Sequence, residues 1–269
     1  MAMFRRNRPP AAGQPAQYGP PTGQPVAVGG GPGSGPGVPP GAVGGAAGPG
    51  GPASGPGGDL RQMLAGAPVD RVRLDLRLVV TRPGPHLAPP AMVWPLGDEL
   101  VAVACVKLPD GQIVTAEVPM AQAWGLGAED VWLQSATNLR GEHFARSEFD
   151  APGGADMYAF VGQGWPATAQ LTRLGEALGA DLPAGALVAF PDDNTLISVP
   201  IRNQRIPETV SAMFATGHEL TRGMPPLSPR AYWWHEGVAE PLDVQWHGQQ
   251  AHVNGSARFG QVMAGVPQR

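Results

Sequence analysis

The sequence predicts an α+β protein with a mainly antiparallel sheet, helices packed on one face of that sheet, and a disordered Gly/Pro-rich tail in front. Three observations support this fold class. The first 58 residues are rich in glycine and proline, strand-like segments come in pairs joined by turn residues, and helical patterns fall between those pairs. No regular strand–helix–strand alternation is present, which argues against a parallel sheet.

The leading segment differs sharply in composition from the rest of the chain. Residues 1–58 hold 18 of the 39 glycines and 13 of the 32 prolines, with few large apolar side chains. Ordering a backbone residue costs about 1–2 kcal/mol, and this segment has little apolar area to offset that cost. We expect a disordered tail over 1–58 and a single α+β domain over 59–269.

The first half of that domain contains one helix, one long strand and one hairpin. Asp59 can cap a helix over 60–65. Apolar and charged residues alternate over 72–80, as in a half-solvated antiparallel strand. Pro109-Asp110-Gly111 is a turn sequence, and it separates strand-like runs over 99–108 and 112–118.

Three arginines, Arg71, Arg73 and Arg77, fall on the polar side of the 72–80 pattern. Such a row suits either an anion-binding patch or a solvated sheet surface, and we favour the solvated surface.

The second half continues with alternating helices and strand pairs. Helical spacing is found over 128–140 and 167–178 and from Pro207 onward, where proline suits the first helical position. The remaining strand-like runs are 157–161, 186–190, 196–200, 231–234 and 238–247.

Composition narrows the function classes. The formal net charge is −4 and charged residues make up 15% of the chain, so no nucleic-acid partner is indicated. Cys105 is the single cysteine and lies in an apolar run, which predicts a buried, inert thiol and no intramolecular disulfide. We expect no transmembrane segment and no secretory signal, hence a cytoplasmic protein.

No motif predicts a reaction, a cofactor or a metal. The six histidines are scattered without metal-ligand spacing. Asp192 and Asp193 suit a turn better than acid–base chemistry. Gly162-Gln163-Gly164 lies between a strand and a helix, as a phosphate-binding loop would, but lacks the third glycine and the lysine of stronger motifs. We therefore predict no catalytic, cofactor-binding or metal-ligating residue.

Trp124-Gly125-Leu126 leads into an acidic helix start, and that helix ends in Ala136-Thr-Asn-Leu139. This stretch resembles the YtpQ-like family of uncharacterised bacterial proteins. The segments 187–196 and 225–228 are similar to later strands of the family. The resemblance covers about residues 100–236, although Asp192-Asp193 replaces the family's Arg-Asp pair. It implies a cytoplasmic bacterial protein with this fold class and implies no activity.

The leading functional hypothesis is a non-enzymatic binding or adaptor domain with a flexible N-terminal tether. All seven tryptophans lie in the folded part, and tryptophan is enriched at interfaces. We expect a protein partner or self-association. The candidate interaction surface comprises Trp124, Tyr232, Trp233, Trp234 and His235.

Two alternatives stay open. One is an enzyme whose site is assembled from distant residues, namely His218, Glu219, His235, Glu236 and Asp192. The other is a structural or assembly protein that clusters through its tail.

Overall fold

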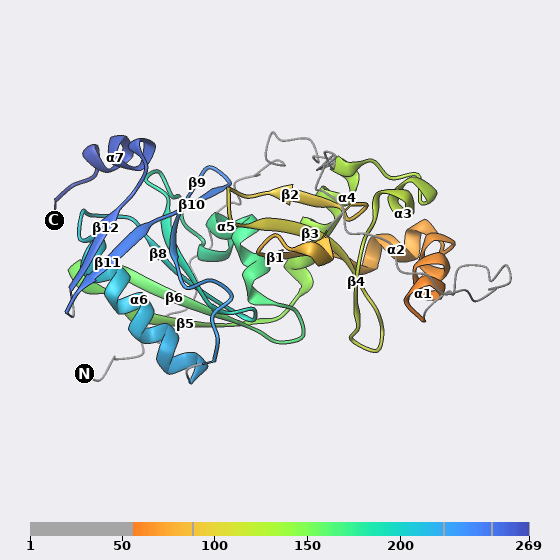
Figure 1. Ribbon diagram of the computed structural model, residues 1–269, viewed down its shortest axis with the longest axis horizontal. Coiled ribbons are helices and arrows are strands. Elements are labelled where there is room, and N and C mark those ends of the chain that lie inside the picture. The colour runs from red at the N-terminus through yellow and green to blue at the C-terminus, as the bar shows by residue number, and fades with distance from the viewer. Residues whose placement is uncertain (1–55, 88, 223, 249, 269) are drawn as a thin grey trace, which may run out of the picture.

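The computed structural model describes residues 56–87, 89–222, 224–248 and 250–268. Their strands form three antiparallel sheets, which succeed one another along the long axis of the molecule (Figure 1). The N-terminal sheet has the order β1-β3-β2, with β4 also paired to β3, and the central sheet has the order β10-β9-β7-β8-β6-β5. The outer hairpin is β11-β12.

The strands of the N-terminal sheet are β1 Leu76–Thr81, β2 Val93–Pro95, β3 Val101–Lys107 and β4 Ile113–Thr115. Those of the central sheet are β5 Phe144–Asp150, β6 Asp156–Gly162, β7 Ala186–Asp192, β8 Thr195–Pro200, β9 Ala231–His235 and β10 Val238–Pro241. The outer hairpin consists of β11 Asp243–His247 and β12 Gln250–Asn254.

The α-helices are α1 Pro56–Ala65, α2 Val69–Asp75, α3 Val118–Ala123, α4 Ala128–Asn138, α5 Leu174–Leu178, α6 Ile206–Thr221 and α7 Ala257–Ala264. Four 3-10 segments are η1 Pro85–Leu87, η2 Leu139–Gly141, η3 Pro152–Gly154 and η4 Ala167–Arg173.

The central sheet divides the core into two clusters. Along β7, Val188 and Phe190 belong to the first cluster, whereas Leu187 and Ala189 belong to the second. Alternate side chains of a strand point to opposite faces, so the clusters lie on the two faces of one sheet. The N-terminal sheet and α1–α5 lie with the first cluster. Helices α6 and α7 and the outer hairpin cover the second (Figure 1).

The structure confirms the predicted α+β class with antiparallel sheets. The strands are divided among three sheets rather than joined in one. Both predicted hairpins form, as β3–β4 and as β7–β8, and the helix predicted over 128–140 forms as α4 followed by η2.

The predicted strand 72–80 is wrong in its first half. Helix α2 occupies 69–75, and β1 begins only at Leu76. Val72 and Leu76 are buried while Leu74 between them is 66% exposed, which is helical spacing rather than alternation. The change of element also separates the arginines, because Arg71 pairs with Asp75 on α2 whereas Arg77 lies on β1 and pairs with Glu142. They form no common face.

Other segments also depart from expectation. The helix predicted over 167–178 is η4 followed by the short α5, and β2, β5, β12 and α7 were not predicted. Residues 56–58 begin α1, and the rest of the predicted disordered tail lies outside the described residues. Within the described part of the chain, no helix combines the length and the apolar character needed to cross a membrane.

Candidate functional site

An apolar hollow lies beside helix α6, at the end of strand β7. Three segments line it: the C-terminal half of α6, the end of β7, and the chain from 224 to 229. We call it the α6 groove. Its lining residues are Ala189, Phe190, Pro191, Met213, Phe214, Gly217, His218, Thr221, Met224, Pro226, Ser228 and Pro229.

Helix α6 begins near a proline and ends just before a residue with left-handed backbone conformation. Pro207 lies in its first turn, where the missing N–H of proline costs nothing. The helix ends at Thr221, because Arg222 adopts a left-handed conformation (φ 52°) and donates its backbone N–H to His218 O. The chain turns there and returns along the groove.

Gly217 brings α6 close to the central sheet. A Cβ atom at this position would lie 2.8 Å from Cγ of Pro191, too close for any side chain. Because Gly217 lacks a side chain, the helix packs directly on the end of β7. Met213 and Thr221, one turn away on either side, then form the wall next to the sheet.

A buried hydrogen-bond network holds the opposite wall. The Tyr232 hydroxyl lies 2.7 Å from Ser228 Oγ and donates to Glu99 Oε2 at 3.1 Å. Ser228 Oγ also accepts the backbone N–H of Arg230. Burial raises the pKa of Tyr232, and Glu99 raises it further, so the phenol stays protonated and remains a donor at neutral pH. The network fixes Ser228, and with it the segment from Met224 to Pro229.

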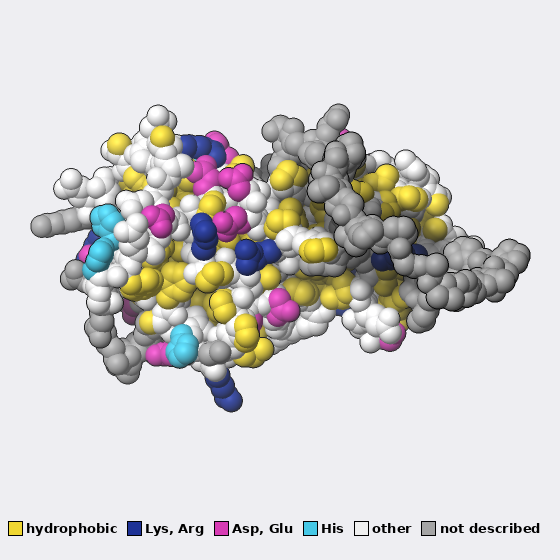
Figure 2. Space-filling view, in the orientation of Figure 1, with side chains coloured by type: hydrophobic (Ala, Val, Ile, Leu, Met, Phe, Trp, Pro, Cys, Tyr) yellow, Lys and Arg dark blue, Asp and Glu magenta, His cyan; other side chains and the backbone are white. Residues whose placement is uncertain are grey.

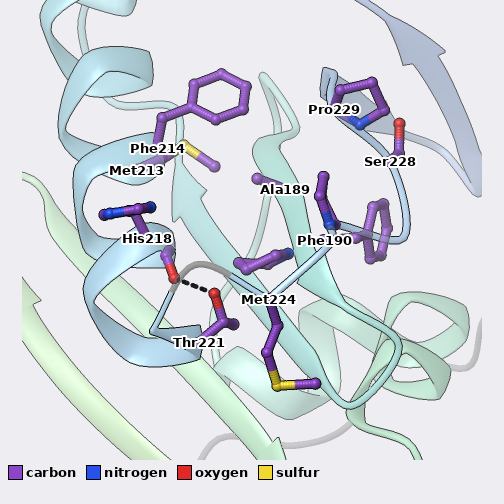
Figure 3. A pocket seen from close by; sticks show the side chains of 12 residues that line it. Ala189, Phe190, Met213, Phe214, His218, Thr221, Met224, Ser228 and Pro229 are labelled. Atoms are coloured by element: carbon purple, nitrogen blue, oxygen red, sulfur yellow. Dashed lines mark hydrogen bonds between the residues drawn. The ribbon is translucent and has the colours of Figure 1, made fainter.

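The resulting groove is small and apolar. Its volume is about 250 Å³. Figure 3 shows Met213 and Phe214 of α6 on one side and Ser228 and Pro229 on the other, with Ala189 between them. Met224 extends along the rim and is 59% exposed. In the space-filling view, hydrophobic side chains gather over this side of the molecule (Figure 2).

A second hollow adjoins the first on the side of the outer hairpin. Phe214 and Pro229 line both, and the second is completed by Arg230, Leu242, Asp243, Val244 and Trp246. Trp246 is 48% exposed and meets Phe214 edge-to-face, with ring centroids 6.0 Å apart. The two hollows therefore adjoin at Phe214 and Pro229, and the second is the more polar of the two, with Arg230 and Asp243 in its lining.

The hydroxyl groups that line the α6 groove already form hydrogen bonds within the protein. Thr221 Oγ1 donates to Gly217 O at 2.9 Å, and Ser228 is held by Tyr232 and Arg230. The remaining lining atoms are mainly aliphatic carbon, aromatic carbon and thioether sulfur. This arrangement suits burial of apolar groups, which is favourable by about 25 cal/mol per Å².

The surface predicted from the aromatic residues does not form. Trp124, Tyr232, Trp233 and Trp234 are each at most 5% exposed. Trp124 donates to Leu64 O at 2.8 Å and Trp233 to Ala184 O at 2.9 Å, so both indole N–H groups are satisfied inside the protein. Strand β9 lies inside the central sheet, between β7 and β10, and this position buries its aromatic rings.

His235, the fifth predicted residue, belongs to a polar cluster with the C-terminal helix. Arg258 of α7 lies 3.0 Å from His235 Nδ1 and pairs with Glu236 and Glu240. His235 Nε2 lies 3.2 Å from Pro183 O, and its ring stacks on Trp233. Because Arg258 can only donate, Nδ1 accepts, and the proton of the neutral ring lies on Nε2. These contacts link α7 to strands β9 and β10 of the central sheet.

The other residues considered for an enzyme site lie elsewhere. His218 lines the α6 groove, and Asp192 accepts the backbone N–H of Asn194 in the β7–β8 turn. Among the described residues, no three His, Cys, Asp or Glu side chains gather as a metal site would require. Cys105 is buried, as expected from the sequence, and burial raises the pKa of its thiol to about 12.

Sequence reasoning missed the groove. The helix beginning at Pro207 was predicted, but no groove beside it was. A helix followed by Met224-Pro225-Pro226 and Pro229 is a pattern that could have indicated an exposed apolar wall, because prolines keep the returning chain from packing as a strand.

The chain was also compared with known proteins. Neither the family models, nor the curated proteins, nor the solved structures gave a match. The resemblance to the YtpQ-like family therefore stays a prediction.

Proposed function

We propose that the protein is a non-enzymatic binding domain that takes a short apolar segment of a partner protein into the α6 groove. The observation that carries this proposal is the groove itself. It is an open apolar hollow, and the hydroxyl groups in its lining already form hydrogen bonds within the protein.

The size of the groove favours side chains over a whole small molecule. Sites for small molecules usually measure about 300–1,000 Å³. The α6 groove, at about 250 Å³, lies below that range and suits one or two large apolar side chains of a peptide.

The layout of the surface favours an extended ligand. The groove and the hollow at Trp246 are separate but share Phe214 and Pro229, so a peptide could place one anchor in each. Met213 and Met224 add adaptability, since methionine side chains reshape around different partners. Arg230 and Asp243 line the second hollow and offer polar contacts there.

A library of random twelve-residue peptides, selected against the full chain, provides the test. We expect the selected peptides to share apolar anchors such as Leu, Met or Phe. Met224→Asp should weaken their binding at least about tenfold, because it places a charge against the apolar ligand.

Met63→Asp is the matched control. Met63 is 60% exposed and Met224 is 59% exposed, but Met63 lies on α1, outside the groove. It should leave peptide binding unchanged. Peptides without apolar anchors, or binding that responds equally to both variants, would refute the proposal.

A further inference from the structure

Strands β10 and β11 are two parts of one extended run of chain, joined at Leu242. The backbone of this run alternates between two sides. Leu242 donates its N–H to Ala231 O, at the start of β9, whereas Ala239 donates its N–H to Leu96 O on the opposite side. Because hydrogen-bonding positions alternate along an antiparallel strand, the even-numbered residues face the β9 side and the odd-numbered residues face away from it.

The hairpin of β11 with β12 agrees with this alternation. His247 pairs with Gln250 across a turn of two residues. In such a hairpin the pair next to the turn exchanges backbone hydrogen bonds, so the odd-numbered residues of β11 bond to β12. The N–H and C=O groups of Val244 and Trp246 therefore face the other edge, on the side of β9.

Strand β9 begins too late to cover that edge. Within the described part of the chain, β11 and β12 form a sheet of two strands only. If β9 were extended backward in its register with β10, Pro229 would lie opposite Val244. Proline has no N–H to donate, and the N–H of Arg230 bonds to a side chain, Ser228 Oγ. The chain before β9 thus leaves the sheet, and β11 keeps an edge that can accept a strand.

The second hollow is lined by the residues that would flank an extended β9. Pro229 and Arg230 contribute one side, Val244 and Trp246 of β11 contribute another, and Phe214 of α6 adds an apolar surface. The volume of this hollow is about 430 Å³, larger than that of the α6 groove, and its lining is more polar. A hollow beside backbone donors and acceptors of a strand edge suits an extended polypeptide backbone.

The side chains of β11 determine which face of an added strand is apolar. Val244 packs against the second core cluster, and Trp246 meets Phe214 edge-to-face, so both point to the side of α6. Directly opposed side chains of an antiparallel pair lie on the same face of the sheet. The two residues of an added strand that bond to Val244 and Trp246 therefore also point toward α6, and the residue between them points away.

We propose that the partner segment binds by strand addition. It pairs antiparallel with the outer edge of β11, in line with β9, and directs two apolar side chains, at its positions i and i+2, toward α6. About four backbone hydrogen bonds to Val244 and Trp246 hold it in place. This inference rests on the proposed function and specifies how the partner is recognised, because β11 selects an extended backbone and the apolar surface around Phe214 selects alternate side chains.

The spacing of apolar anchors in peptides selected against the full chain is the first test. Anchors two residues apart are expected, because alternate side chains of a strand share one face. Anchors three or four residues apart are the pattern of a helical ligand. That pattern overturns strand addition.

Ester substitution in a selected peptide tests the backbone pairing directly. Replacing the amide of an anchor residue by an ester removes an N–H that is donated to β11, without adding bulk. It should raise the dissociation constant at least about threefold at either anchor, and about tenfold when both are replaced. The same change at the residue between the anchors should have an effect below about 1.5-fold. No loss at the anchors overturns strand addition.

A proline in the protein gives the reciprocal measurement. Val244→Pro removes the N–H that faces the added strand, which the pairing with β12 does not use, and should weaken peptide binding at least about tenfold. Val253→Pro is the matched control. Val253 lies opposite Val244 on β12, packs against the same core cluster, and directs its N–H away from β11. It should leave the dissociation constant within about threefold of wild type.

Failure of this inference is distinguishable from failure of the proposed function. Selected peptides without apolar anchors, or with binding indifferent to Met224→Asp, reject both. Peptides that respond to Met224→Asp but are indifferent to the esters and to Val244→Pro bind the α6 groove without adding a strand, and they reject strand addition alone. An equal loss of binding in the two proline variants, with secondary structure intact by circular dichroism, also rejects it.

Discussion

Strands β9 and β11 use tryptophan in opposite ways. Trp233 and Trp234 on β9 are almost fully buried, whereas Trp246 on β11, twelve residues later, is 48% exposed. Strand β9 has a neighbour on each side and packing on both faces, but β11 belongs to a two-stranded hairpin at the margin. The difference teaches that the position of a strand in its sheet, more than its aromatic content, decides whether a tryptophan stabilises the fold or remains available for binding.

The largest effect is expected from Trp233→Ala. Trp233 packs against Phe259, stacks with His235 and lies under Arg258, so its loss opens a cavity between the sheet and α7. We expect the free energy of unfolding to fall by about 3–5 kcal/mol. Urea denaturation measures it. A loss below about 1 kcal/mol would show that the buried Trp233 contributes little to stability, contrary to this comparison.

The contribution of a glutamate to stability should likewise depend on whether it lies in the interior or at the margin of the protein. The Glu142 side chain is 6% exposed and bonds both Arg77 and Lys107, at 2.8 and 2.7 Å. Glu142→Gln should cost about 2–3 kcal/mol, because it leaves two cations short of a buried partner. Glu208→Gln is the control: Glu208 and Arg205 are about half exposed, and their pair should matter by less than about 0.5 kcal/mol.

The Glu142 cluster also predicts a dependence on pH. Burial alone would raise the pKa of Glu142, but hydrogen bonds from Lys107 and Arg77 outweigh it, and the pKa lies below its ordinary value. A depressed folded pKa stabilises the protein above the unfolded pKa and loses that effect as pH falls through the folded value. The difference in unfolding free energy between wild type and Glu142→Gln should therefore shrink on acidification below about pH 4. A constant difference would contradict the ion-pair account.

Tyr232→Phe is expected to have a smaller effect. The ring and its edge-to-face contact with Phe190 remain, but Ser228 and Glu99 lose a hydrogen-bond partner. A cost of about 1–2 kcal/mol follows, measurable by thermal unfolding. Because Ser228 holds the 224–229 wall, peptide binding should weaken as well. Unchanged binding would show that the wall does not depend on this network.

The smallest effect on stability is expected from Trp246→Ala, under about 1 kcal/mol, since the ring is half exposed and its main aromatic contact is Phe214. Its effect on peptide binding should exceed its effect on stability. Titration of the selected peptides, together with thermal unfolding, measures both. If the substitution lowers the free energy of unfolding more than it weakens peptide binding, Trp246 belongs to the core, and it does not differ from the tryptophans of β9.

Local patterns predicted the hairpins and the longer helices correctly, because turn residues and helical spacing act within a few positions. Pro109-Asp110-Gly111 and the Pro207 helix start are examples. The same method failed at 72–75, where a short amphipathic segment fits both a strand and a helical turn, and the packing of Val72 and Leu76 decided the outcome. It also missed β5, whose charged residues resemble a loop until β6 is placed beside it.

The sequence by itself determined the α+β class, the antiparallel hairpins, the burial of the cysteine and the positions of most helices, since these depend on local propensity and on the pattern of apolar residues. Only the tertiary structure decided which aromatic rings are buried and where α6 leaves an open groove. Those properties depend on contacts between segments far apart in the chain, such as Gly217 with Pro191 or Tyr232 with Glu99. Such contacts cannot be predicted from amino-acid composition or from the spacing of residues within a segment.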